Sequence, residues 1–152
     1  GKPGNCPGRN GGPPFHGEEG ASQTALDLTT AYCTDRKAFG GRLSDLGAIR
    51  QRLAMRQAEV DAVRASMYHA AWLRDTGQDN VREMSGVKAF GAEVVNRVMY
   101  DCLQFHGGMG YMRESTIERM TRDARILPIG GGATEIMLEE VAKRSLGDVK
   151  VC

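Results

Sequence analysis

The most informative segment of the chain is Gln104-Phe105-His106-Gly107-Gly108-Met109-Gly110-Tyr111, where a helical pattern runs into three closely spaced glycines. Glycine has no Cβ, so such a break lets the backbone approach a ligand or another chain closely. The helix that leads into it is predicted to begin near Asp79 or Asn80, and its apolar stripe is Val87, Val94, Val98 and Phe105. Gly86 and Gly91 interrupt this helix and predict close contact with a neighbouring helix.

Four further helices are predicted around this one. A short helix from Gly20 ends near Phe39-Gly40-Gly41, and a long helix begins at Ser44 or Asp45 and ends near Asp75-Thr76-Gly77. Two short helices follow, at about 116–125 and 134–146, on either side of Pro128. No window alternates between apolar and polar residues, so no strand is predicted. The pattern predicts an all-α fold, an antiparallel up-and-down bundle of the four-helix type.

The first nineteen residues differ from the rest of the chain. Residues 1–19 are dense in glycine and proline and nearly free of aliphatic side chains. Such a segment buries too little apolar surface to offset the entropy of ordering it. We therefore predict an irregular segment at 1–19, a helical domain at 20–147 and a short tail at 148–152.

Composition excludes several classes of protein. The chain has 152 residues and a net charge of +1, with acids and bases interspersed, which predicts neither nucleic-acid binding nor attraction to an anionic membrane. No apolar run is long enough for a membrane span, so a soluble domain is expected. The four cysteines lack zinc-site spacing and predict free thiols in a reducing compartment, either bacterial cytoplasm or mitochondrial matrix.

Four strings occur in a fixed order along the chain: Arg36-Lys37-Ala38-Phe39-Gly40, the stretch at 104–111, Arg122-Asp123-Ala124-Arg125, and Gly130-Gly131-Gly132. In this order and spacing they resemble the C-terminal helical domain of the acyl-CoA dehydrogenases, flavoenzymes that oxidise acyl-CoA thioesters. The resemblance covers roughly Gly20 to Leu146. It is greatest to the long-chain and isovaleryl branch of that family.

The resemblance implies FAD as the cofactor and suggests which residues contact it. Arg36 matches an arginine that reaches the FAD of a neighbouring subunit, and Phe39 would pack against the flavin or the interface. The remaining matched positions are Gln104, Phe105, His106, Gly107 and Gly108 toward the adenosine-pyrophosphate half, and Thr134 and Glu135 toward the flavin. From the residues alone, a solvated charge at a helix end is the favoured interpretation of Arg36. For the glycine turn the alternative is a plain helix-capping turn, and the third glycine, Gly110, favours a special backbone over it.

The resemblance also implies that this chain lacks a catalytic base. Gly131 and Gly132 match positions that face the substrate, and in much of the family the first of them is the glutamate that removes a proton from the substrate. The long-chain and isovaleryl branch places its glutamate on an earlier helix, at a spacing that falls near Asn10 here. Neither Gly131 nor Asn10 can accept a proton, so no catalytic residue is identified. Ala133 and Gly47 replace a threonine and a glutamine that contact the cofactor.

Two functions are consistent with these observations. The first is the FAD-contacting, oligomerising domain of an acyl-CoA dehydrogenase, which takes acyl-CoA as substrate and passes electrons to an electron-transfer flavoprotein. By this resemblance the chain forms a dimer or tetramer and is inactive alone, because most of the site belongs to other domains. The alternative is a non-catalytic helical module that oligomerises or docks on a partner.

Overall fold

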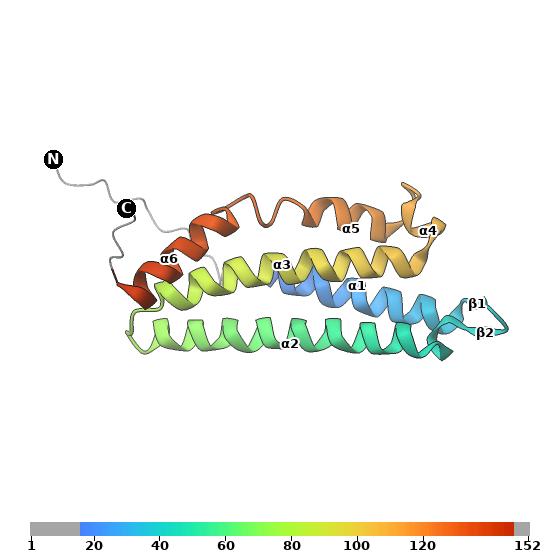
Figure 1. The fold of residues 1–152 in the computed structure, drawn as a ribbon, viewed down its shortest axis with the longest axis horizontal. Coiled ribbons are helices and arrows are strands. Elements are labelled where there is room, and N and C mark those ends of the chain that lie inside the picture. The colour runs from blue at the N-terminus through green and yellow to red at the C-terminus, as the bar shows by residue number, and fades with distance from the viewer. Residues whose placement is uncertain (1–15, 148–152) are drawn as a thin grey trace.

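The computed structural model describes residues 16–147. Its elements, in chain order, are α1 (His16–Asp35), β1 (Lys37–Ala38), β2 (Gly41–Arg42), the 3-10 turn η1 (Leu43–Asp45), α2 (Gly47–Asp75), α3 (Val81–His106), α4 (Gly108–Tyr111), α5 (Thr116–Ala124) and α6 (Thr134–Leu146). Helices α2 and α3 run antiparallel along the long axis, and α5 and α6 lie end to end over α3 (Figure 1). The predicted all-α bundle is confirmed.

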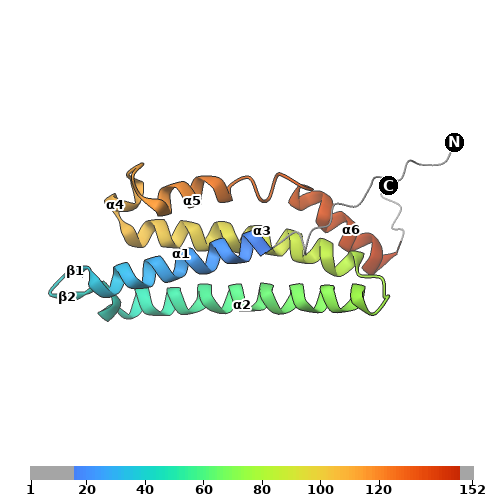
Figure 2. The ribbon, with the colours of Figure 1, turned by 180° about the vertical axis from the view of Figure 1, so that it is seen from behind.

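Helix α3 is the centre of the core and packs against α1, α2, α5 and α6 (Figures 1 and 2). Val87, Val94 and Val98 of its apolar stripe are buried, as their helical spacing predicts, in one core with Val60 and Val63 of α2 and Ile117 of α5. The fourth member of the predicted stripe, Phe105, is only partly buried, because it lies at the open end of the bundle. A Cβ placed on Gly91 would lie 3.4 Å from Val63 Cγ1, and one on Gly86 would lie 3.8 Å from Val141 Cγ2. Gly91 therefore lies close against α2, as predicted, whereas a Cβ at Gly86 would make only an ordinary contact with α6.

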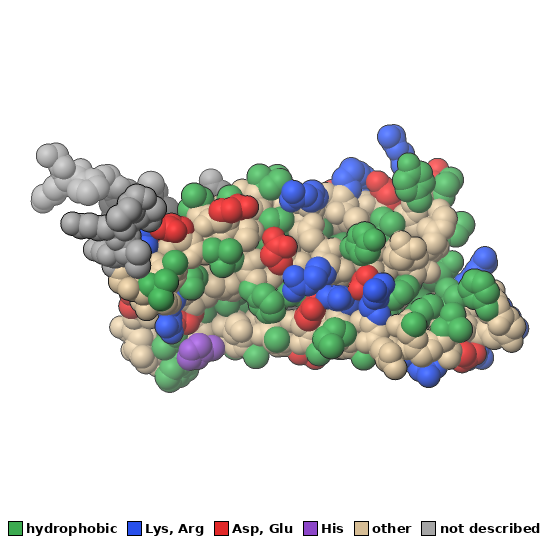
Figure 3. Space-filling model, in the orientation of Figure 1, with side chains coloured by type: hydrophobic (Ala, Val, Ile, Leu, Met, Phe, Trp, Pro, Cys, Tyr) green, Lys and Arg blue, Asp and Glu red, His purple; other side chains and the backbone are tan. Residues whose placement is uncertain are grey.

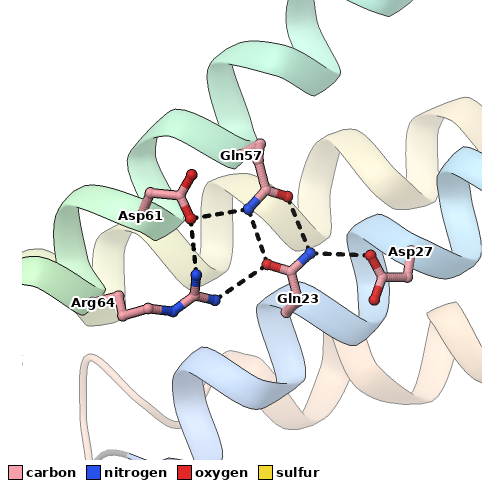
Figure 4. Close-up of polar contacts among 5 residues, drawn as sticks. All are labelled: Gln23, Asp27, Gln57, Asp61 and Arg64. Carbon is pink, nitrogen blue, oxygen red and sulfur yellow. Dashed lines mark hydrogen bonds and ion pairs between the residues drawn. The ribbon is translucent and has the colours of Figure 1, made fainter.

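A polar network ties α1 to α2 on another side of the bundle (Figure 4). The amides of Gln23 and Gln57 bond reciprocally, at 3.1 and 2.9 Å. Asp27 accepts from Gln23 and Asp61 accepts from Gln57, while Arg64 donates to both Asp61 and Gln23 Oε1. Because each amide uses both its oxygen and its nitrogen, the network fixes how far α1 is shifted along α2.

The structure corrects three predicted boundaries, the start of α2 and both ends of α1. Helix α2 begins at Gly47 rather than Ser44 or Asp45, because Leu43–Asp45 form the 3-10 turn η1. Helix α1 begins at His16 rather than Gly20, so the predicted irregular segment at 1–19 extends too far toward the helix. It ends at Asp35, before Phe39. An antiparallel hairpin follows, with Lys37 opposite Arg42, where no strand was predicted. Predictions for residues 1–15, including Asn10, and for 148–152 lie outside the described residues.

Candidate functional site

An open hollow of about 1280 Å³ lies at the end of the bundle where α1 runs into the hairpin and α3 turns into α4. This is the end of Figure 1 that carries β1, β2 and α4. The hollow exceeds the roughly 300–1000 Å³ of ordinary small-molecule pockets. Its lining includes every predicted cofactor residue from the first two strings: Arg36, Phe39, Gln104, Phe105, His106, Gly107 and Gly108.

Arg36 is held by its backbone and free at its side chain. Its N–H donates to Tyr32 O at 2.8 Å, and its carbonyl accepts from Leu43 N at 3.0 Å. The exposed guanidinium forms no ion pair or hydrogen bond with any residue in the described part of the chain. Its planar fork of donors is therefore available to a carboxylate or a phosphate.

Phe39 occupies a conformation that its side chain disfavours. It is the first residue of the two-residue turn between β1 and β2, with φ +55°, and Gly40 follows with φ +82°. Phe39 is 88% exposed, so packing against the described residues does not compensate the backbone strain. A bulky apolar side chain that breaks a local rule at the mouth of a hollow is typical of a functional position.

Replacing Phe39 tests this interpretation through stability. Phe39→Asn creates an Asn-Gly turn, which favours positive φ at both positions, so we expect the free energy of unfolding to rise by about 1 kcal/mol. Urea unfolding followed by circular dichroism measures the change. Phe90→Asn is the matched control. Phe90 is also an exposed phenylalanine, but it lies within α3 and has no positive φ, so this substitution should not raise the free energy of unfolding. Equal or lower stability for Phe39→Asn would contradict the strain.

The turn between α3 and α4 is built from its glycines. Gly107 has φ +58°, and its N–H donates to Gln104 O at 3.1 Å, so this amide is already used within the protein. A Cβ on Gly110 would lie 2.6 Å from Leu103 O, which is closer than real contacts allow. Gly110 therefore lets α4 fold back onto the end of α3. The Gln104 side chain is exposed, without a hydrogen bond to the residues described.

The other predicted positions lie elsewhere. Thr134 and Glu135 begin α6, and the turn before them reaches α3 at Lys88, whose Nζ donates to Leu127 O at 2.8 Å. Lys88 and Gln104 are sixteen residues apart on α3, which is about 24 Å at 1.5 Å per residue. The structure therefore does not bring Thr134 and Glu135, or Gly131 and Gly132, to the hollow that contains Arg36.

Several lining residues were missed from the sequence. Tyr32 lies one helical turn before Arg36 and so shares its face, a spacing that could have indicated it. The hollow is lined on the side of α4 by Met109, Met112 and Glu114, and Met109 is 61% exposed. Their only signal in the sequence is that they follow the glycine turn.

Other chemistry-bearing groups are structural. Asp101 is buried and accepts from Arg56 Nε at 2.8 Å, and Figure 3 shows charged side chains gathered over this α2–α3 face. Burial raises the pKa of the Cys102 thiol to about 11, which keeps it unreactive.

Within residues 16–147 no group of histidine, cysteine or carboxylate side chains could hold a metal ion. No helix in that range is long and apolar enough to cross a membrane.

The bundle thus presents an open hollow lined by a free arginine, an exposed aromatic and a glycine turn, and these features define a helical-bundle domain with a candidate ligand site. Residues 16–146 match the family model for the acyl-CoA dehydrogenase C-terminal domain. The chain belongs to the acyl-CoA dehydrogenase family, as its C-terminal domain.

Individual relatives agree with this assignment. The Bacillus subtilis protein YngJ, a probable acyl-CoA dehydrogenase, is 39% identical over 84% of this chain and 33% of its own length. The mitochondrial long-chain specific acyl-CoA dehydrogenase of Sus scrofa is 36% identical over 84% of the chain and 30% of its own. The crystal structure of a probable acyl-CoA dehydrogenase from Mycobacterium abscessus superposes with a TM-score of 0.81 at 39% identity, covering 84% and 34%. The chain therefore spans about a third of these relatives.

Proposed function

We propose that this chain is the FAD-contacting, oligomerising domain of an acyl-CoA dehydrogenase, which removes two hydrogens from an acyl-CoA thioester. When bound, the flavin accepts a hydride, which no side chain can do. The observation that carries the proposal is the free guanidinium of Arg36, in one hollow with Gln104 and an exposed phenylalanine. These groups fit one part of a dinucleotide, which has charged phosphates and flat apolar rings.

Each group has a definite task in this proposal. Arg36 donates two parallel hydrogen bonds to the pyrophosphate. The backbone beside Gly108 approaches the phosphates without an intervening side chain, and Gln104 bonds the adenosine part. Phe39 covers an apolar ring surface, which offsets its backbone strain only in the bound state.

The separation of the two residue groups supports a site shared between copies. About 24 Å of α3 separates the level of Gln104 from that of Gly131. We assign the Arg36 hollow to the FAD of a second copy, and the turn before Thr134 and Glu135 to the cofactor and acyl-CoA of the chain's own subunit. Homo-oligomerisation follows from this assignment. Electrons would pass to an electron-transfer flavoprotein, in bacterial cytoplasm or mitochondrial matrix.

One observation favours the alternative, a non-catalytic helical module. Gly131 occupies the position of the family's proton-abstracting glutamate and supplies no base. Such a module would keep the bundle and its oligomer contacts without turnover.

The test is FAD binding by the chain and by two variants. The chain is mixed with FAD and passed over a sizing column while flavin absorbance is recorded. Weak FAD binding by an oligomer is expected, because most of the site belongs to other domains, and Arg36→Ala and Gln104→Ala should each weaken it further, the former about tenfold from a lost charged hydrogen bond. Arg74→Ala is the control, because Arg74 is exposed at the far end of α2. A colourless oligomer, or equal FAD affinity in all four proteins, would favour the non-catalytic module.

A further inference from the structure

Two side chains of α3 hold the segment between α5 and α6 by its main-chain carbonyls. Lys88 Nζ donates to Leu127 O at 2.8 Å, and Asn96 Nδ2 donates to Ala124 O at 3.1 Å. Ala124 is the last residue of α5, and the final carbonyls of a helix have no partner within the helix itself. The first residues of this segment are therefore attached directly to α3.

The part of the segment that follows closes on itself. Thr134 N donates to Pro128 O at 3.0 Å, so residues 128–134 form a short closed loop. Gly131 and Gly132 lie within this loop, with φ of +69° and +109°. Because the loop is short and closed, any movement of its first residue also moves both glycines.

Lys88 lies directly beneath this loop. A Cβ placed on Gly131 would lie 4.0 Å from Lys88 Cε, so the lysine stem packs under the glycine while its Nζ reaches Leu127 O. Lys88 is buried, and burying an ammonium group costs free energy that an apolar side chain of the same length would not cost. A lysine at this position therefore indicates a task that needs its charged donor.

We infer that Lys88 is a positioning residue, which sets the place of Gly131 through the carbonyl of Leu127. The inference rests on the proposed function, in which this turn belongs to the acyl-CoA and cofactor of the chain's own subunit, and it names the side chain that positions the turn. A site of this kind has to be held within about 0.5 Å of its productive geometry by supporting residues. A purely structural lysine would stabilise the bundle without fixing the loop.

The first test is hydrogen exchange of the chain, measured by NMR. Lys88→Met keeps an apolar stem and removes the charged donor. We expect the Thr134 amide to exchange about tenfold faster or more, because the loop loses a hydrogen bond from a charged group, and the Gly131 resonance to shift. The Gly110 amide is the internal control: it donates to Gly107 O in the other glycine turn, so its exchange rate should not change.

Two further variants separate positioning from general stability. Asn80→Ala also removes a side-chain hydrogen bond to a carbonyl, since Asn80 Nδ2 donates to Ala70 O at 2.8 Å, but it leaves the loop intact. Lys88→Arg keeps a charged donor and should restore most of the protection of Thr134. An unchanged Thr134 rate in Lys88→Met, or equal acceleration in Asn80→Ala or Lys88→Arg, would overturn the role of the Lys88 ammonium.

The second test uses a dehydrogenase that contains this chain. At saturating acyl-CoA, Lys88→Met should slow flavin reduction about tenfold or more, because a misplacement of about 1 Å can cost 100-fold in rate. Asn80→Ala should keep the parent rate. If Lys88→Met loosens the loop and the rate is unchanged, the loop does not meet the acyl-CoA, and that part of the proposed function fails. If the exchange rate is unchanged, this inference fails and the proposed function stands.

Discussion

Gly110→Ala is expected to lower the free energy of unfolding by about 2–3 kcal/mol, the typical cost of forcing an extra methyl group into a packed site. The added Cβ would lie 2.6 Å from Leu103 O and 2.9 Å from His106 Cβ. The first contact is with backbone, which no change of rotamer can relieve. Helix α4 must therefore move away from the end of α3.

The expected loss extends to the hollow, because the second clash is with His106. Gly108→Ala is the matched control, since a Cβ at Gly108 meets nothing within 4 Å and its φ needs no glycine. Urea unfolding gives the stability of both variants, and the stacking of His106 on Tyr32 is followed by the ring resonances of both residues. If Gly110→Ala is as stable as Gly108→Ala, the close return of α4 is wrong.

Helical periodicity predicted the long elements because packing and local preference agree there. Val87, Val94 and Val98 of α3 are buried where the sequence places them, and Gly91 lies against Val63 of α2. The hairpin at 37–42 was missed because strands of two residues are too short to show alternation. The turn Phe39-Gly40 gave no signal either, since a phenylalanine is disfavoured at positive φ.

The hollow was harder to predict than the helices. Its groups come from the ends of α1 and α3, which are far apart in the sequence and meet only in the folded bundle. The strings at Arg36 and Gln104 were linked by family resemblance rather than by any periodic pattern. The geometry of His106 could not be predicted at all, because its tautomer depends on the carbonyl of Cys102 and on Tyr32.

Gly131→Glu is expected to raise the rate of flavin reduction by an acyl-CoA about 100-fold or more, in a dehydrogenase that contains this chain, because a positioned general base contributes that much. A Cβ at Gly131 meets only Lys88 Cε, at 4.0 Å, so the glutamate has room. Its φ of +69° costs the new side chain about 1 kcal/mol of stability. This loss of stability is smaller than the roughly 2.7 kcal/mol by which a 100-fold increase in rate lowers the activation free energy.

The ammonium group of Lys88 favours the ionised form of the carboxylate that Gly131→Glu introduces. Lys88 is buried beneath the turn, and a cation this close favours the ionised carboxylate, which is the form that removes a proton. Gly131→Gln is the matched control, because it carries the same bulk and strain but accepts no proton. The rate is read from the loss of flavin absorbance in a single turnover with acyl-CoA. If the two variants reduce flavin equally slowly, position 131 does not face the reacting carbon, and the missing base has to be sought in another part of the enzyme.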